Sequence, residues 1–198
     1  MNTQTQTTTL AGTLPDLTEL FRIAALYTST DKPALSSALI KPGQNHAKAT
    51  ATDSTAAIIY TTETLAGTGP SIHLPAREIA KHLANAVKTI GKRHAANIPA
   101  TITATPNTWN IEVHHVTGIT SAGTHEQPAH WPNMTPLFTT PQEPSQTPYR
   151  IAAEQLDRLT RTADYITHTH ASPTKPNHYT TNSNHGHAQI IIMPCRIN

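Results

Sequence analysis

Histidine is the residue type in this chain whose number and spacing come closest to a reactive or metal-binding site. The sequence holds 13 histidines, with three close pairs: His114 and His115, His168 and His170, and His185 and His187. Alternate residues of a strand share a face, so such pairs could offer two imidazoles to one zinc ion. Acidic residues are scarce nearby, and no His-Glu-X-X-His motif occurs. We therefore expect no metal site and no cofactor, and keep a His-rich metal-binding protein as the least favoured alternative.

The residues that usually carry out catalysis form no recognised arrangement. The sequence has no glycine-rich phosphate loop and no Gly-X-Ser-X-Gly motif, and its single cysteine, Cys195, lacks an evident His or Asp partner. No two aspartates have the spacing of a catalytic carboxylate pair. Asp53 is instead expected to accept backbone N–H bonds in a turn between two strands. These observations predict a non-catalytic protein with no catalytic residues.

Basic residues gather on one face of a predicted helix that starts after Pro75. At about 100° per residue, Arg77, Lys81, Lys88 and Lys92 fall within about 60° of one another, opposite an apolar face that includes Ile79. Two further predicted helices carry basic residues, one with Arg22 and one with Arg158 and Arg161. A solvated surface is the ordinary interpretation of such a stripe, and attraction of phosphates is the functional one.

Composition limits the classes of protein that this chain can be. The formal net charge is only +2 and charged residues make up 13% of the sequence, so strong overall attraction to nucleic acid is excluded and any DNA contact depends on local placement of charge. Few aromatic residues, 16 prolines and abundant threonine favour short strands with many turns. The lone cysteine fits a reducing cytoplasm, and no apolar run approaches the roughly 18–20 residues of a membrane span. We expect a cytoplasmic protein with no membrane partner.

One order of elements, a short helix followed by several short strands, occurs three times. Helices are predicted from residue 15, from residue 75 to about 90 and over about 152–162, with strands over 35–40, 47–52, 57–62, 72–74, 100–105, 110–116, 165–170, 178–181 and 188–193. The expected parts are a frayed segment at 1–10, a complete domain at 11–138 made of two units (about 11–68 and 69–138), a proline-rich linker at 139–148 and a third unit at 149–198. The fold class predicted is α+β.

Five motifs, taken in order, resemble the bacterial DNA polymerase III beta subunit, the DNA sliding clamp family. They are Ala51-Thr52-Asp53-Ser54-Thr55-Ala56-Ala57, Ile72-His73-Leu74-Pro75-Ala76-Arg77, His130-Trp131-Pro132-Asn133, Gln155-Leu156-Asp157-Arg158-Leu159 and Met193-Pro194-Cys195-Arg196-Ile197. The resemblance implies the DNA-clamp fold, in which repeated β-α-β-β-β units place helices along a central hole and antiparallel sheets outside. It implies a replication processivity factor that encircles double-stranded DNA and docks a DNA polymerase and a clamp loader.

The resemblance also implies two sets of functional residues. The DNA-facing residues are expected to be Arg22, Arg77, Lys81, Lys88, Lys92, Arg93, Arg158 and Arg161. The pocket for partner peptides is expected to comprise Thr52, Thr55, Ala56, Ala57, Ile191, Met193 and Pro194. In the family pattern Gly, His, Arg and Leu stand where this chain has Ser54 to Ala57, so the pocket should be shallower here.

Three units are half the number that a bacterial clamp chain contains, since those chains have three two-unit domains and close as dimers of twelve units. Four chains of this length would also supply twelve units, which predicts a homotetrameric ring. The third unit alone would leave a sheet edge and an apolar helix face in water, so we expect it to pair with a neighbouring chain. The alternative is a clamp-like regulator or decoy that binds a clamp, loader or polymerase without encircling DNA.

Overall fold

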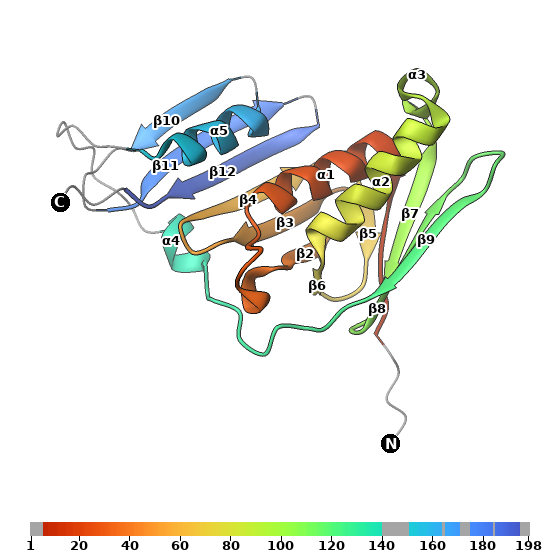
Figure 1. The fold of residues 1–198 in the computed structure, drawn as a ribbon, viewed down its shortest axis with the longest axis horizontal. Helices are drawn as coiled ribbons and strands as arrows, with labels where there is room; N and C mark the ends of the chain where they lie inside the picture. Colours follow the sequence, from red (N-terminus) through yellow and green to blue (C-terminus); the bar gives the residue numbers. More distant parts are fainter. Residues whose placement is uncertain (1–5, 140–150, 164, 171–174, 184, 195–198) are drawn as a thin grey trace.

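The computed structural model of this chain contains two antiparallel sheets, with three of its helices, α1, α2 and α5, along one side of them (Figure 1). It describes residues 6–139, 151–163, 165–170, 175–183 and 185–194. No helix in this described part is long and apolar enough to cross a membrane. The predicted α+β class is confirmed.

The first unit consists of a strand, a long helix and four further strands. These are β1 (Thr8–Thr13), α1 (Leu14–Leu26), β2 (Ala38–Pro42), β3 (Ala47–Thr52), β4 (Ala56–Thr62) and β5 (Ala66–Thr68). Thr13 begins α1 as its N-cap, because its hydroxyl accepts a hydrogen bond from the Asp16 N–H at 3.3 Å. Leu17, Leu20 and Ala24 recur at helical spacing and are completely buried, which fixes the face of α1 that packs on β3 and β4.

The second unit repeats this order. It comprises β6 (Ile72–Leu74), α2 (Ala76–Ile90), the short α3 (Lys92–Ala95), β7 (Pro99–Ala104), β8 (Thr108–Val113) and β9 (Ile119–Thr124). α2 ends at Gly91, whose φ of 88° lies in the left-handed region that glycine adopts without strain. Trp109 of β8 is buried, and a Cβ at Gly123 of β9 would lie 2.5 Å from its ring. Glycine therefore lets β9 pack closely over the tryptophan.

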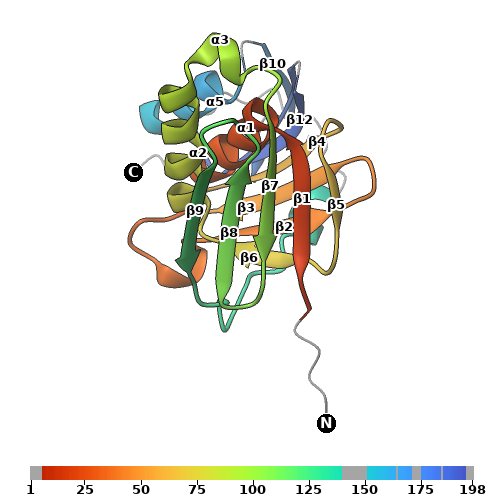
Figure 2. The same ribbon diagram turned by 90° about the vertical axis from the view of Figure 1, so that its right-hand side faces the viewer.

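The first two units exchange their leading strands. β1 pairs with β7 of the second unit, with Leu10 opposite Ile102, and gives a five-stranded sheet of order β5-β1-β7-β8-β9 (Figure 2). β6 pairs in turn with β2 of the first unit, with Leu39 opposite His73. Each sheet thus contains strands of both units, so neither unit buries its apolar face without the other.

The third unit joins the sheet of the first. It comprises α5 (Ala153–Thr162), β10 (Ile166–His170), β11 (Asn177–Ser183) and β12 (Gly186–Ile192). β12 pairs with β4, with Ile190 opposite Ile58, and produces a seven-stranded sheet of order β10-β11-β12-β4-β3-β2-β6. β12 therefore has a neighbour within the same chain, and the sheet edge that the third unit leaves lies at β10. The other end of this sheet is β6.

Other expectations are also corrected. Thr8 to Leu10 were expected to fray, but they belong to β1, since β7 supplies a paired and buried position for them. Strands β5 and β9 and the short helix α4 (Thr135–Thr139) were not predicted. Apart from Thr139, the predicted linker at 139–148 lies outside the described residues. Residues 149–150, at the expected start of the third unit, and residues 1–5, in the segment expected to fray, also lie outside them.

Candidate nucleic-acid interface and docking pocket

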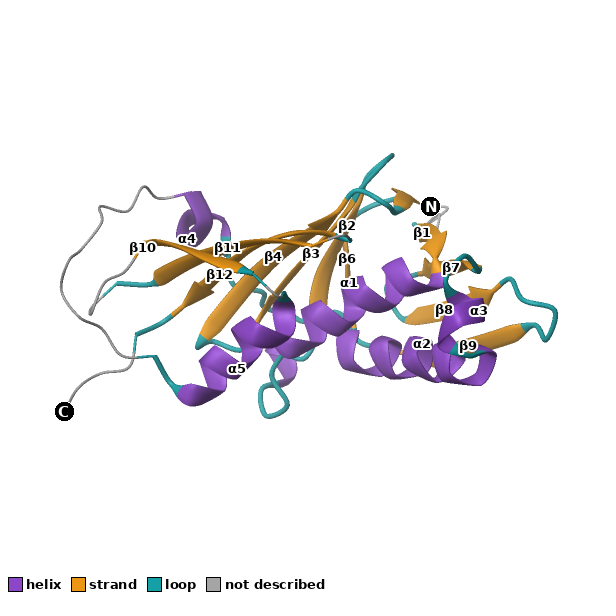
Figure 3. Cartoon of the chain, turned by 90° about the horizontal axis from the view of Figure 1, so that it is seen from above, coloured by secondary structure: helices purple, strands orange, loops and turns teal. Residues whose placement is uncertain are grey.

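Helices α1, α2 and α5 lie on the same side of the two sheets, as Figure 3 shows from above. α1 and α2 are antiparallel neighbours, because the start of each helix is bonded near the end of the other. Arg77 in the first turn of α2 donates to the carbonyl oxygen of Thr28, just after α1, at 2.6 Å. At the opposite end, the Leu14 N–H donates to the Ile98 carbonyl at 2.8 Å.

A groove of about 490 Å³ lies between these three helices, and we call it the helix groove. Its apolar floor is formed by Ala25, Leu26 and Ala80, and its polar lining consists of Arg22, Arg77, Lys81, Glu154, Asp157, Arg158 and Arg161. Five of the eight predicted DNA-facing residues thus meet in one groove, although they come from three helices far apart in sequence. Two acidic residues among them lower its net positive charge.

Three of these five cations also form contacts that fix the positions of the helices. Arg22 forms an ion pair with Glu19 at 2.7 Å and donates at 2.8 Å to the carbonyl oxygen of Arg161 near the end of α5. Its pKa is raised, chiefly by the hydrogen bond to Glu19. Arg77 bonds Thr28, as described above, and Arg158 pairs with Asp53 and Glu154. These arginines have structural partners that the sequence did not indicate.

The remaining predicted cations are exposed. Lys81 and Lys88 lie on α2, and Lys92 and Arg93 form the first turn of α3. Within the described residues none of these four makes an ion pair, while Arg161 lies 3.6 Å from Asp157 with 59% of its side chain exposed. α2 and α3 therefore carry the charges that are most available to a phosphate backbone.

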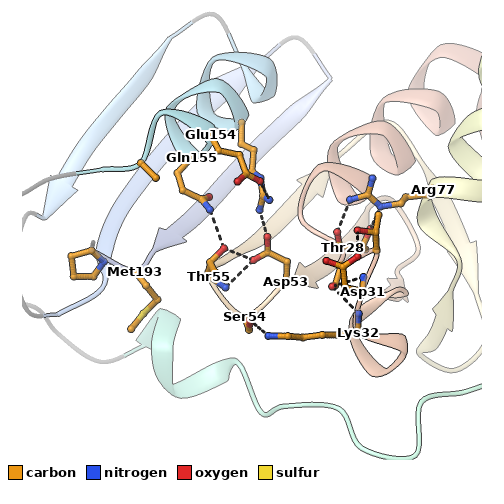
Figure 4. Close-up of a pocket in the computed structure, with 15 residues that line it drawn as sticks. Thr28, Asp31, Lys32, Asp53, Ser54, Thr55, Arg77, Glu154, Gln155 and Met193 are labelled. Carbon is orange, nitrogen blue, oxygen red and sulfur yellow. Dashed lines mark hydrogen bonds and ion pairs between the residues drawn. The ribbon is translucent and has the colours of Figure 1, made fainter. Parts of the chain in front are cut away.

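A second hollow, of about 580 Å³, opens where the third unit meets the first, and we call it the turn pocket (Figure 4). Of the predicted peptide-pocket residues, Thr55, Met193 and Pro194 line it. The other four do not line it and are buried, with 2–3% of their surface exposed: Thr52, Ala56, Ala57 and Ile191. The backbone joins the two sides, since the Met193 N–H donates to the Thr55 carbonyl at 2.9 Å.

The turn pocket is crossed by an ion pair that the sequence did not predict. Arg158 of α5 donates to the Asp53 carboxylate in the turn between β3 and β4 and to Glu154. Asp53 also accepts from the N–H groups of Thr55 and Ala56 at 2.8 and 2.9 Å, which confirms its predicted turn role. Burial alone would raise the pKa of Asp53, but these bonds from Ala56, Arg158 and Thr55 outweigh it and lower the pKa.

The same turn contains a strained residue. Ser54 has a φ of 82°, and it is the only residue other than glycine with positive φ in the described part of the chain. It occupies the position where the clamp pattern has glycine, for which this conformation has no steric cost. Its hydroxyl accepts a hydrogen bond from Lys32 at 2.6 Å. The substitution thus retains the turn and adds a polar contact on the rim of the turn pocket.

Histidines from each of the three close pairs contact other side chains of the fold. His185 lies 2.9 Å from the buried Asp16 and links the β11–β12 hairpin to the start of α1, while His168 stacks on Tyr179 with ring centroids 4.7 Å apart. His114 lies within hydrogen-bond distance of Thr101, at 3.2 Å. Among the described residues no three His, Cys, Asp or Glu side chains gather as a metal site would require.

Comparison with known proteins identifies the fold. No protein-family model matches the sequence, and no curated protein matches it either. Among solved structures, the DNA polymerase III beta subunit of Thermotoga maritima superposes with a TM-score of 0.69 at 10% identity, over 96% of this chain and 66% of that one. The beta sliding clamp of C. crescentus gives 0.68 at 11% identity, over 100% and 67%, and the beta subunit from Streptococcus pyogenes gives 0.67 at 14%, over 94% and 65%. This chain has the fold of a bacterial sliding clamp.

The expectation drawn from the five motifs is thereby confirmed at the level of fold. The clamp fold explains why β1 and β6 change places between the two sheets and why three helices share one side. The matches span about two thirds of each solved chain, with identities between 10% and 14%. Matches of this kind establish the fold.

Proposed function

We propose that this chain is the subunit of a homo-oligomeric ring that encircles duplex DNA and acts as a non-catalytic processivity factor for a DNA polymerase. The observation that supports this best is the helix groove, in which Arg22, Arg77, Lys81, Arg158 and Arg161 meet on the helical side of a clamp fold. A ring closed with this side inward would present those cations to the phosphates.

The distribution of charge suits sliding better than tight binding. Exposed lysines with flexible side chains attract phosphates without sequence preference. Each exposed charge contributes little to the binding free energy on its own. Arg22 is ion-paired with Glu19, and Arg158 with Asp53 and Glu154, so these two arginines add little net positive charge and the exposed lysines provide most of the attraction. A net charge of only +2 also avoids strong retention at any one position on DNA.

The turn pocket is the proposed docking place for the polymerase or clamp loader. Thr55, Met193 and Pro194 form its rim, and Met193 remains 46% exposed. Asp53 and Arg158 make its floor polar where the family resemblance implies an apolar one. We therefore expect the bound segment to bring a polar or charged group next to its apolar anchor.

Charge reversal on α2 tests the DNA-facing side. In Lys81→Glu/Lys88→Glu, two exposed cations of the proposed hole become anions, and we expect retention on circular DNA to fall at least about tenfold at 100 mM salt. The matched control is Lys41→Glu/Lys48→Glu. These two lysines lie opposite each other on β2 and β3 and alternate with residues that are buried under α1, so they face away from the helices.

Two readouts separate binding from assembly. The solution mass of both double variants should equal that of the unchanged protein, and only the α2 variant should lose DNA. Equal retention of the two variants would remove α2 from the DNA face. A protein with a monomeric mass and no retention in any form would favour the clamp-like regulator instead.

A further inference from the structure

Helix α5 is buried far less completely than the helices of the first two units. In α1 the apolar side chains Leu17, Leu20 and Phe21 have no exposed surface, and in α2 Ile79 and Leu83 have none. In α5 only Leu159 is buried among the leucines, with 3% exposed, while Leu156 is 52% exposed. One side of α5 thus faces solvent with an apolar surface.

That side forms a groove of its own, which we call the α5 groove. It has a volume of about 490 Å³ and is lined by Leu156, Leu159, Ala163, Ile166, His168 and Tyr179. Tyr165, next to it in the chain, is 84% exposed. Leu156 and Tyr165 are two of the five large apolar side chains that are exposed among the described residues. Such a concentration of apolar surface is typical of an interface.

The first two units show which structure covers the equivalent surface. There, α1 and α2 lie against each other in antiparallel order, and each unit contributes its leading strand to the other unit's sheet, next to β2 or β7. β10 follows α5 as β2 follows α1 and β7 follows α2. In the described part of the chain β10 pairs only with β11, and the outer side of α5 has no helix beside it.

From this repetition we infer that the α5 groove is covered by the third unit of a second copy of this chain. Two half-domains then complete one clamp domain across a twofold axis, with α5 antiparallel to its copy. A twofold contact uses the same surface on both subunits, so one exposed face needs no other partner. The contact itself requires no DNA. Only its place in a closed ring rests on the proposed function.

The charged residues of α5, Glu154, Asp157 and Arg161, line the helix groove on the opposite side of the helix from the α5 groove. The surface that α5 offers to a second copy is therefore mainly apolar, and the antiparallel order follows from the repetition of the units.

A charge placed in the α5 groove tests the contact. Leu156→Glu changes a half-exposed side chain, so the fold of the subunit should persist. We expect the self-dissociation constant to rise at least about tenfold, because the contact would have to bury an unpaired carboxylate. Ala129→Glu is the control: it adds the same charge at an exposed position between β9 and α4. Light scattering at a series of concentrations gives the masses.

Cross-linking identifies the faces that meet. In a Cys195→Ser background, Thr160→Cys places a thiol on the exposed groove side of α5, and a short bismaleimide should join two copies through it. Ser36→Cys, exposed between α1 and β2, should stay unlinked. A monomeric mass at tens of micromolar, or an association that Leu156→Glu leaves unchanged, would overturn the inference. Cross-linked assemblies that DNA does not retain would support the contact and contradict the clamp function instead.

Discussion

Asp53 connects the first and third units through a single carboxylate. One of its oxygens holds the β3–β4 turn by accepting from the N–H groups of Thr55 and Ala56, and the other accepts from Arg158 of α5. Gln155, one turn earlier in α5, donates to the Thr55 hydroxyl at 2.9 Å. The position of α5 over the sheet therefore depends on this turn.

Replacement of Asp53 by asparagine should weaken that connection in a pH-dependent way. Asparagine can still accept the two turn N–H bonds, but it lacks the charge that pairs with Arg158. We expect Asp53→Asn to lower the free energy of unfolding by about 1–2 kcal/mol at pH 7. The folded state lowers the pKa of Asp53, so its stabilisation is present above the ordinary aspartate pKa of about 4 and is lost as the pH falls through the folded value.

Urea denaturation of both proteins at pH 7 and at pH 3 measures this difference. The two curves should lie apart at pH 7 and approach each other at pH 3. A difference that is the same at both values would show that the charge of Asp53 does not provide the stabilisation.

At the scale of single residues, the sequence predicts a role where the signal is local. The turn role of Asp53 follows from an aspartate between two threonine-rich strands, and its N–H partners lie two and three residues away. Its pairing with Arg158 joins positions 105 residues apart, and nothing in the local pattern of either residue indicates it. The same holds for Arg22 and Arg161. The sequence shows two cations, but it does not indicate that Arg22 of α1 donates to the Arg161 carbonyl near the end of α5.

At the scale of elements, strand β6 at the end of the seven-stranded sheet is covered by the segment that follows β9. The Gln127 side chain accepts from the His73 N–H at 3.1 Å and donates to the His73 carbonyl at 3.0 Å, as a neighbouring strand would. Trp131 lies over the His73 ring with centroids 4.5 Å apart. A single amide side chain thus satisfies an edge strand that would otherwise offer its backbone to another chain.

This edge should loosen in mild acid. Burial lowers the pKa of His73, with a further contribution from His125, so the folded state favours neutral imidazole. For a lowered histidine pKa the stabilisation is present above the ordinary value of about 6.5 and is lost as the pH falls below it. We expect His73→Phe, which keeps a ring against Trp131, to lose less stability than the unchanged protein between pH 7.5 and 5.5.

Urea midpoints of both proteins at the two pH values test this expectation, with His46→Phe as the control at an exposed histidine between β2 and β3. The control should keep the pH dependence of the unchanged protein. Identical pH dependence in His73→Phe would mean that His73 does not contribute to it.

The elements that sequence predicted and those that it missed differ in apolar content. The strand at 47–52 and the strand at 72–74 were located with their observed bounds, because buried residues alternate within them. Strand β9 contains mainly small and polar residues, and β5 has three residues, so neither shows a clear period. Both become strands because longer neighbours, β8 and β1, provide partners for their backbones. The strand state of β5 and β9 thus follows from pairing with distant segments, which a local sequence pattern does not reveal.

At the scale of the whole molecule, the pairing of β12 with β4 decides where assembly can occur. The three units form one row, in the order second, first and third, because the third unit extends the sheet of the first. The terminal unit at one end is the third, which carries the α5 groove. The sequence predicted three units and an incomplete third, but placing the third beside the first required the strand order.

Four such rows would supply twelve units, as many as the family's ring contains. A ring of four rows joined end to end through twofold contacts has two kinds of contact between chains, and the contact between third units would be one of them. A ring of this kind holds DNA by topology and not by affinity, so it should leave through a free end of the duplex. This property separates encirclement from ordinary electrostatic binding, which a linear duplex of the same sequence supports equally well.

Retention on circular and linearised DNA is therefore the most direct test. The protein is assembled on a nicked circular plasmid, separated from free protein by gel filtration and then treated with a restriction enzyme that cuts the plasmid once. If the chain forms a sliding clamp, it should remain with the circular plasmid and be released once the plasmid is linear. Equal retention on both forms, or none on either under conditions where the protein is assembled, would contradict the account.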